Sequence, residues 1–507
     1  MKIGIIGGGA AGLMAAINAK NEKNEVVILE GNNDIAKKIM ITGSGKCNFW
    51  NSDQDIKHYY SNNKEFIKDI INEDDEKEIF NIFDRMGLIY KEKNGYYYPF
   101  SNQAITIKNM FLYEINRLGI SVINNFFVND IKYIDNKFLI NNELKFDYLI
   151  VATGSKCFPK TGSTGIGYDL LKNFGHHLFK PLPSLTNLKS EGKFLKLWNG
   201  IRTDVKASLY VDDEFVKEEN GEIQLTDYGV SGICIFNLSG LVSMALNNKK
   251  KVSIKINFLP FINKDYYEYF EEQTNKTGKN VYDLVEGILN YKLLNILVND
   301  KKLFTEMNYY EKDNFINNLT SFELKIINTG NFDECQVCIN GFDLNEINLK
   351  TMESKLIPNL FIIGELLDLT GDCGGYNLGI AFRTGLRAGI LMIRVRQVKV
   401  PILDKDNFLK YLLKKVNIKE NELIKYEIKK ESLDARGSDV FFVYEVDINT
   451  TKDDKLLSRN DKDIISSPDE TFKFSITGDK ELKNRPIIVG AGPAGLFAAY
   501  LDRKSVV

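Results

Sequence analysis

The stretch MKIGIIGGGAAG at residues 1–12 restricts the fold of this chain more than any other feature. A short apolar strand runs into Gly7, Gly9 and Gly12, which have G-x-G-x-x-G spacing, and a helix-forming segment follows. In this pattern the glycines permit a tight turn, a close approach to a pyrophosphate, and close packing of helix on strand. The phosphate lies at the helix N-terminus, where Ala10 and Ala11 form the first turn. We therefore expect a dinucleotide site in an α/β Rossmann-type domain.

A second apolar strand, residues 26–29, ends in Glu30. The fingerprint places an acidic residue about 20 positions after the glycines, where it accepts hydrogen bonds from ribose hydroxyls. The alternative is a glycine-rich turn that binds nothing. Strand, helix, second strand and terminal acid in register favour the dinucleotide site.

Later landmarks fit FAD better than NAD. FDYLIVATG at residues 146–154 is a strand ending in Ala152, Thr153 and Gly154, and LFIIGELLD at 360–368 is another strand, followed by Gly364 and Glu365. A glycine-rich loop with Gly374 and Gly375 then leads into a helix from about Asn377. The N-terminus of such a helix can stabilise the negative charge that collects on a reduced flavin. An NAD-dependent dehydrogenase remains the alternative.

The chain resembles the aminoacetone oxidase-like or BaiN-like bacterial FAD-dependent oxidoreductases over residues 1 to about 390. The resemblance rests on several stretches in family order, among them GGGAAG at 7–12, AKKIMITGSGKCNFWN at 36–51, YPFSNQA at 98–104, VATGSKCFPKTGSTGIGYDL at 151–170, GEIQLTDYGVSG at 221–232 and NLKTMESKLIPNLFIIGELLDLTGDCGGYN at 348–377.

The resemblance implies a two-dinucleotide-type FAD fold in which an insertion interrupts the Rossmann domain. It implies that Lys38 joins the glycines and Glu30 around the ADP half, and that Val128 contacts the adenine through its backbone. It further implies cofactor contacts near the flavin and along the rest of the cleft from Gly45, Cys47, Asn48, Asp368 and Tyr376, in addition to the strand-end and loop residues given above.

The predicted insertion has two parts. Residues 190–262 alternate at period two in places, which favours an inserted β domain, and residues 263–325 have helical period and are expected to form a cap able to cover the flavin. The FAD-binding domain would then comprise residues 1–189 and 326–391.

No residue is assigned to catalysis and no metal site is expected. Cys335 and Cys338 form a lone C-x-x-C without further zinc ligands, and we interpret the pair as coincidental. Cys47 is interpreted as a small packing residue, and His176-His177 as surface or capping residues. Tyr96 to Tyr98 could line the pocket or form a half-buried strand.

The C-terminal part reads as the start of another protein. Residues 392–485 resemble the α+β leader of a second FAD-dependent dehydrogenase family, and 486–501 repeat the fingerprint with Gly490, Gly492 and Gly495. The last residues, 502–507, match one reading frame of a sequencing-library adapter, so we expect a truncated record. The sequence leaves open whether the join near Met392 is a natural fusion.

The composition excludes some partners. The formal net charge is −2, which does not suggest nucleic acid or an anionic membrane as partner, and six scattered cysteines in 507 residues favour the cytoplasm. The sequence thus predicts an FAD-dependent oxidoreductase that transfers hydride equivalents between flavin and a small organic substrate. The reaction would be amine oxidation or double-bond reduction with NADPH or NADH as electron donor. A flavin protein with a structural role is the alternative from another class, and the oligomeric state stays open.

Overall fold

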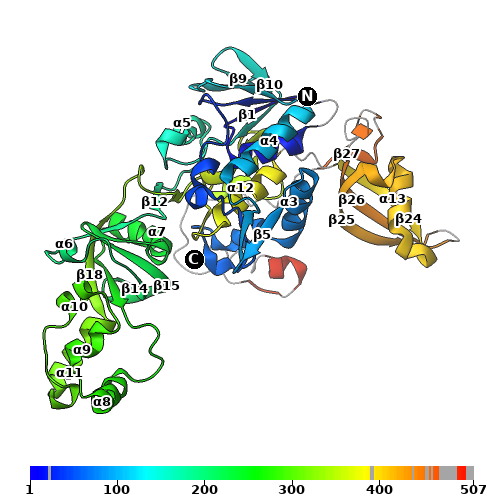
Figure 1. Ribbon diagram of the computed structural model, residues 1–507. Coiled ribbons are helices and arrows are strands. Elements are labelled where there is room, and N and C mark those ends of the chain that lie inside the picture. Colours follow the sequence, from blue (N-terminus) through cyan, green and yellow to red (C-terminus); the bar gives the residue numbers. More distant parts are fainter. Residues whose placement is uncertain are drawn as a thin grey trace. The chain divides into compact units, whose positions relative to one another are not determined.

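The computed structural model describes residues 1–20, 24–388, 393–436, 439–450, 456–457, 459, 461–467, 488–490 and 492–497 (Figure 1). The chain divides into two compact units. The larger holds Met1–Met392, Ile418–Lys425 and Asn449–Ser458, and the smaller holds Ile393–Asn417, Tyr426–Ile448 and Arg459–Val507.

The larger unit is built on a seven-stranded sheet with the order β20-β21-β22-β11-β1-β2-β7. Five strands are parallel: β1 (Lys2–Ile6), β2 (Glu25–Leu29), β7 (Ser121–Ile123), β11 (Tyr148–Val151) and β22 (Leu360–Ile362). The short strands β20 (Ile347–Asn348) and β21 (Glu353–Ser354) extend one edge antiparallel. Because the central strands are parallel, their carboxyl ends lie along one edge, where ligands bind in such folds.

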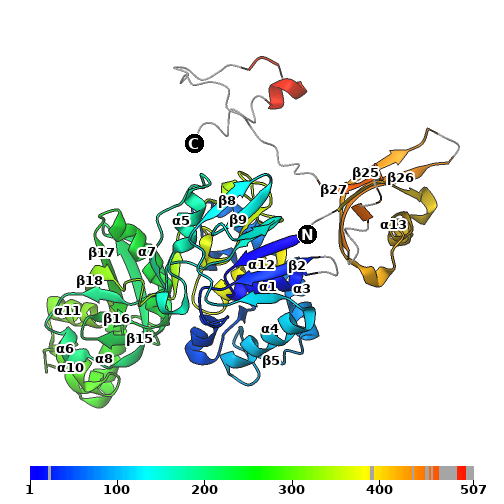
Figure 2. The same cartoon turned by 90° about the horizontal axis from the view of Figure 1, so that it is seen from above.

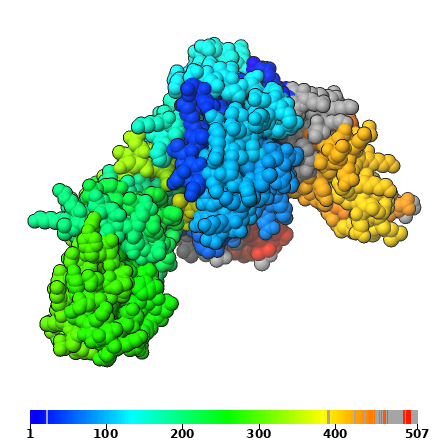
Figure 3. Space-filling model, in the orientation of Figure 1, coloured from blue at the N-terminus to red at the C-terminus, as the bar shows by residue number. Residues whose placement is uncertain are grey.

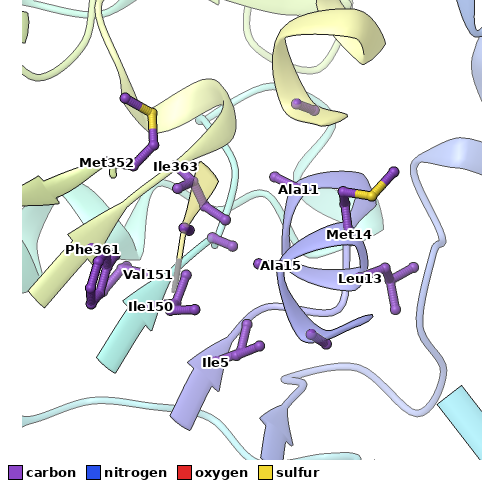
Figure 4. Close-up of a cluster of buried hydrophobic side chains, with 14 of the residues drawn as sticks. Ile5, Ala11, Leu13, Met14, Ala15, Ile150, Val151, Met352, Phe361 and Ile363 are labelled. Carbon is purple, nitrogen blue, oxygen red and sulfur yellow. The ribbon is translucent and has the colours of Figure 1, made fainter. Parts of the chain in front are cut away.

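The helices α1 (Ala10–Ala19) and α12 (Tyr376–Arg387) lie side by side on this sheet (Figure 2). Side chains of α1 and of β1, β11 and β22 form one buried cluster that includes Ile5, Leu13, Ile150 and Phe361 (Figure 4). Strands covered on both faces read as continuous apolar runs, which is why IGII and YLIV lack alternation. This arrangement is the predicted Rossmann-type α/β fold.

Further elements surround the sheet. Four of them are helices: α2 (Ile67–Ile70), α3 (Glu73–Arg85), α4 (Ala104–Leu118) and α5 (Ile166–Lys172). There are two three-stranded sheets, one of β3 (Trp50–Asn51), β6 (Tyr96–Pro99) and β5 (Tyr90–Lys93), and one of β10 (Leu144–Phe146), β9 (Lys137–Ile140) and β8 (Ile131–Ile134). Two strand pairs complete the set, namely β4 (Tyr59–Tyr60) with β23 (Thr370–Gly371) and β12 (Leu182–Ser184) with β19 (Val337–Ile339).

The segment between β12 and β19 contains a closed barrel of six strands. Their order is β13 (Leu188–Ser190), β16 (Gly229–Ser231), β15 (Glu214–Thr226), β14 (Arg202–Val211), β17 (Val252–Asn257) and β18 (Phe322–Thr329). β18 lies beyond the helical segment, so the barrel closes with strands from both sides of it. The barrel and the helices make up the green surface in Figure 3.

Five helices belong to this segment as well: α6 (Leu195–Trp198), α8 (Tyr266–Thr277), α9 (Val281–Glu286), α10 (Tyr291–Leu297) and α11 (Tyr309–Thr320). A sixth, α7 (Ile233–Asn247), was not expected from the sequence. Its residues are apolar on most sides because the barrel and β12 cover it, so it lacks the amphipathic period that reveals a surface helix.

The smaller unit is an α+β structure. Its sheet has the order β25 (Leu423–Asp434), β26 (Phe441–Thr450), β24 (Ile393–Pro401), β27 (Ile464–Ser466), and α13 (Phe408–Val416) packs against β24. The fully buried Arg394 donates to Asp447 from Nε at 2.5 Å and from Nη2 at 3.0 Å, so this buried charge is paired.

Part of the second glycine fingerprint is described, and its turn resembles the first. Gly490 has φ +108° and Gly7 has φ +104°. A Cβ on Gly495 would lie 2.0 Å from the Gly490 oxygen, as one on Gly12 would from the Gly7 oxygen. The expected join at Met392 and the expected adapter residues 502–507 lie outside the described residues. Among the helices that the structure describes, none has the length and apolar character needed to cross a membrane.

Candidate functional site

A cavity of about 1010 Å³ opens at the carboxyl ends of β1, β2, β11 and β22. Most of the residues predicted to contact the cofactor line it: Gly7, Gly9, Ala10, Ala11, Glu30, Lys38, Asn48, Val128, Ala152, Thr153, Gly154, Gly364, Glu365, Gly374, Gly375 and Asn377. Its volume lies at the upper end of the roughly 300–1,000 Å³ typical of ligand pockets.

The turn from β1 to α1 forms a cradle at which a phosphate group fits. A Cβ on Gly7 would lie 2.4 Å from the Ala152 oxygen, so only glycine fits there. Gly9, the N-cap of α1, has no atom within 4 Å of the Cβ position and opens into the cavity. The first N–H groups of a helix have no partner within it, so α1 presents donors and a positive dipole end to an anion.

Glu30 ends β2 and is buried. Its Oε2 accepts from the Gly8 N–H at 2.8 Å, and its Oε1 accepts from the Asn32 N–H at 2.8 Å and from Asn32 Nδ2 at 2.7 Å. A carboxylate has about four acceptor positions, so these bonds orient Glu30 and leave capacity for ribose hydroxyls. Phe126, Phe127 and Val128 line the same end of the cavity.

Lys38 and Glu365 pair with each other across the cavity wall. Lys38 Nζ lies 2.6 Å from Glu365 Oε2 and 2.9 Å from Oε1, and Ser155 Oγ donates to Oε2 at 2.8 Å. Burial would lower the pKa of Lys38, but the Glu365 carboxylate outweighs it and holds that pKa above its ordinary value. Lys38 therefore stays charged, and its ion pair with Glu365 joins the β2 side of the cavity to the β22 side.

The loop before α12 brings backbone to the cavity at its other end. Gly374 and Gly375 have φ +129° and +97°, and a Cβ on Gly375 would lie 2.5 Å from the Trp50 backbone. Asn377 fixes the loop, because its Oδ1 accepts from the Gly371 N–H at 2.9 Å and its Nδ2 donates to the Gly371 oxygen at 2.8 Å. The N-terminus of α12 is thus held against the cavity.

An apolar and aromatic wall completes this end. It was only partly expected, and it consists of Tyr96, Tyr98, Leu185, Ile233, Phe236, Val337 and Cys373. The two tyrosines alternate with Tyr97 on β6, and the Tyr97 ring packs instead against Phe49 and Phe80. Both interpretations of the three tyrosines therefore hold. Ile233 and Phe236 come from α7, which no sequence signal marked as part of the site.

Five predicted contacts do not line the cavity, namely Gly12, Gly45, Cys47, Asp368 and Tyr376. Gly12 packs on Gly7, and Gly45 lies in an exposed turn. Asp368 faces away and accepts from the Asn62 N–H at 2.7 Å, while the Tyr376 ring stacks on His58. Cys47 is fully buried, and burial raises its thiol pKa to about 11, as suits a packing residue.

A buried polar network lies next to Cys373. Asp372 accepts from Tyr60 OH at 2.9 Å, contacts His58 Nδ1 at 2.9 Å, and lies 3.5 Å from Lys217 Nζ. Burial raises the Asp372 pKa, although Lys217 lowers it. Lys217 comes from β15 and Asp372 from the loop before α12, so the network links the barrel to the cavity loop.

Two expectations about other segments were wrong. Helices α8–α11 do not line the cavity; within residues 190–325 the lining residues are Ile233 and Phe236 of α7. His176 is buried rather than a surface or capping residue: its Nδ1 lies 2.9 Å from Glu346 Oε2, and its Nε2 lies 2.9 Å from Ser354 Oγ. His177 is exposed.

FAD fits this set of residues. The open Gly9 position, the helix N-terminus behind it and the acid at the end of β2 suit the ADP half. The second helix N-terminus and the aromatic wall suit an isoalloxazine, which is flat, largely apolar and negatively charged when reduced. The described residues hold no group of His, Cys, Asp or Glu that could bind a metal ion.

Comparison with known proteins gives two family matches. The model of the HI0933-like protein Rossmann domain matches residues 1–391, and that of a domain of unknown function, DUF8436, matches residues 392–449. The second match begins where the sequence predicted a join.

Three relatives illustrate the similarity. A 3-dehydro-bile acid delta(4,6)-reductase of Clostridium scindens is 32% identical over 403 residues, which cover 76% of this chain and 98% of that protein. A ribosomal RNA dihydrouridine synthase of Haemophilus influenzae is 25% identical over 404 residues, which cover 77% and 98%. An uncharacterized protein of Clostridium beijerinckii is 36% identical over 112 residues, which cover 22% and 21%.

Proposed function

Because the chain belongs to the HI0933-like Rossmann family, we propose that it reduces a carbon–carbon double bond conjugated to a carbonyl group in a small, flat, largely apolar molecule. The chain is an FAD-dependent oxidoreductase. Bound FAD supplies the two-electron redox chemistry, and the protein supplies binding, orientation and protons. NADPH or NADH is the proposed electron donor, and the cytoplasm is the proposed location.

One observation carries the proposal: a single cavity joins a phosphate cradle to an aromatic and apolar wall. Tyr96, Ile233 and Phe236 offer a flat molecule contact area but no charge. The wall residues carry no carboxylate to pair with a cationic amine, and Asp372, the nearest acid in sequence to Cys373, is already engaged by Tyr60 and His58. The wall therefore favours a neutral acceptor over an amine.

Reduction of a conjugated double bond also needs a proton at the carbon next to the carbonyl group. Tyr96 and Tyr98 line the cavity, and burial raises the pKa of both hydroxyls, so both stay protonated at neutral pH. Tyr96 lies closest to the α12 loop, since a Cβ on Gly374 would lie 2.7 Å from Tyr96 Cε1. We assign the proton donation to Tyr96, with Tyr98 positioning the substrate.

The test is the oxidative half-reaction of single tyrosine variants. Enzyme reduced anaerobically with dithionite is mixed with an unsaturated 3-oxo bile acid, and the return of the flavin absorbance is timed. Loss of a general acid lowers rates by roughly 10²–10⁴-fold. We expect Tyr96→Phe to slow the reaction at least 100-fold at unchanged FAD content, and Tyr97→Phe, whose ring faces away from the cavity, to leave it unchanged. Equal rates for both variants would contradict the assignment.

A second candidate is the reduction of uridine in ribosomal RNA, since the Haemophilus influenzae relative is matched over nearly its whole length. The net charge of −2 provides no general excess of cations for binding phosphates. Salt-dependent binding of a ribosomal RNA fragment, together with its oxidation of the reduced enzyme, would favour this candidate. Peroxide formation with aminoacetone would favour amine oxidation.

A further inference from the structure

Three of the six cysteines meet in one buried cluster. Cys157 Sγ lies 2.7 Å from Cys335 Sγ and 3.1 Å from Cys338 Sγ, and all three thiols are free. Cys157 and Cys335 are fully buried and Cys338 is 5% exposed. With Phe332 packed against them, they form a small hydrophobic cluster of their own. Cys157 lies 178 residues before Cys335 in sequence and yet contacts both members of the C-x-x-C pair. The pair is therefore part of a three-cysteine cluster and not an isolated motif.

The distances suit a disulfide better than a metal. Two thiolates on one tetrahedral zinc ion, with Zn–S bonds of about 2.3 Å, lie roughly 3.8 Å apart, which is farther than either sulfur pair here. A disulfide bond is about 2.05 Å long, so a small movement of either side chain closes the gap. No cluster of possible metal ligands occurs in the part of the chain that the structure describes.

The cluster lies directly behind the cavity wall. Phe158, next to Cys157, lines the cavity, and so do Gln336 and Val337, which lie between the other two cysteines. The Phe158 N–H donates to the Phe332 oxygen at 3.0 Å, so the two segments are already joined by their backbones. Ser155 connects the Cys157 loop to Glu365 and hence to Lys38.

We propose that Cys157, Cys335 and Cys338 form a thiol–disulfide site in which Cys157 is the shared sulfur, bonding to Cys335 or to Cys338. The oxidant class is a peroxide. One thiol is oxidised to a sulfenic acid as the peroxide O–O bond breaks and one water leaves. A second thiol then displaces the hydroxyl group as a second water, so that two thiols and one H2O2 give one disulfide and two H2O.

The third thiol makes the site reversible. Whichever disulfide forms, the remaining cysteine lies beside Cys157, and its thiol can attack the disulfide by thiol–disulfide exchange. An external dithiol can then reduce the disulfide and be oxidised in its place. Burial raises the pKa of the Cys157 thiol far above its ordinary value, so the site resists oxidation near neutral pH and reacts faster in alkaline solution. The bond would tie together two segments of the cavity wall.

The experiment counts and maps thiols in the full-length protein. Reduced protein is treated with hydrogen peroxide in alkaline buffer, where the thiols react faster, and is then quenched, alkylated under denaturing conditions and digested for mass spectrometry. We expect four alkylated thiols instead of six, and cross-linked peptides joining Cys157 to Cys335 and to Cys338. Cys335→Ser should yield only the 157–338 bridge and Cys338→Ser only the 157–335 bridge. Cys234→Ser, a buried cysteine outside the cluster, should still form both.

A second readout is independent of enzyme activity. The bridge closes a long loop and so restricts the unfolded chain, which should raise the melting temperature of oxidised wild-type protein and leave Cys157→Ser unchanged. Six alkylated thiols after oxidation would overturn the proposal. A 335–338 bridge that forms equally well in Cys157→Ser would overturn the role of Cys157 as the shared sulfur.

Discussion

At the scale of single residues, the glycines of the first fingerprint divide into two kinds. Gly7 and Gly12 are required by the protein itself, because a Cβ at either position would overlap backbone atoms at 2.4 Å or less. Gly9 is not, since nothing lies within 4 Å of its Cβ position. Its lack of a side chain is explained by the ligand that approaches there.

Gly9→Ala should therefore separate folding from cofactor binding. We expect an unchanged melting temperature of the apoprotein and FAD binding weakened at least about tenfold, or about 1.4 kcal/mol, because the methyl group occupies the phosphate position. Fluorescence titration of the apoprotein with FAD measures this. Gly287→Ala, with no atom closer than 3.6 Å to its Cβ position, is the matched control. Equal FAD affinity in both variants would mean that the phosphate lies elsewhere.

The adjacent residues His176 and His177 differ in burial and therefore in their effect on stability. Burial lowers the pKa of His176 below its ordinary value of 6.5, despite the opposing effect of Glu346. The folded state then binds fewer protons than the unfolded state, so this contribution to stability is complete above about pH 6.5 and is lost as the pH falls below it. His177 is exposed.

We expect urea unfolding to show a free energy of unfolding that declines below pH 6.5 in wild-type protein and in His177→Gln. The decline should be smaller in His176→Gln, which is less stable at neutral pH because its bonds to Glu346 and Ser354 are altered. A steeper decline in His176→Gln than in wild type would contradict the assigned direction.

Residue-level prediction agrees with the lining of the cavity where backbone geometry dictates the residue type. Gly7 and Gly9 of the fingerprint, the acid after β2 and the glycine pair before α12 all line the cavity, whereas Gly12 packs on Gly7. It did not work for Asp368 and Cys47, because a resemblance places a residue along the chain and does not say which way its side chain points. The Cys157 cluster was equally hidden, since its members come from distant segments.

At the scale of elements, α12 connects the cofactor loop to the rest of the domain. Its last residue, Arg387, is buried and donates from Nε to Asp75 Oδ2 at 2.6 Å and from Nη2 to the Asp69 oxygen at 2.6 Å. It also donates to the Leu349 oxygen. One guanidinium thus holds α12 against α2, α3 and the segment near β20.

Arg387→Met should destabilise the protein by about 3–5 kcal/mol, because it leaves the Asp75 carboxylate buried without its cation. The double variant Arg387→Met with Asp75→Asn should recover part of that loss. Arg85→Met, which removes an exposed arginine at the end of α3, is the control. Chemical denaturation of the FAD-free protein gives the comparison, and an undiminished stability of Arg387→Met would show that the pair is not needed.

Among the elements, strands were easier to predict than their connections. The parallel strands appear as short apolar runs. The strand expected near residues 423–428 lies within β25, and the one expected near 440–446 overlaps β26 from Phe441 on. Closure of the barrel by β18 could not be predicted, because pairing across a helical segment leaves no local signal. α7 could not be predicted because it is buried on most sides and so lacks the amphipathic period of a surface helix.

At the scale of the whole molecule, the cavity belongs entirely to the family domain. Every residue that lines it lies between Ile6 and Ala381, within the 391 residues that the family model matches. The α+β unit that follows matches a different family model. The sequence thus indicated both the flavin-dependent class and the change of family near residue 392. It did not indicate the apolar wall on the substrate side of the cavity, because part of that wall comes from α7.

The most direct test of the account is an anaerobic visible spectrum of the purified full-length protein, reduced with one equivalent of dithionite and then mixed with an unsaturated 3-oxo bile acid. The account predicts a two-banded flavin spectrum that bleaches on reduction and returns as the substrate's conjugated absorbance disappears, one substrate per flavin. A colourless protein that takes up no added FAD, or a reduced flavin that only oxygen reoxidises, would contradict it.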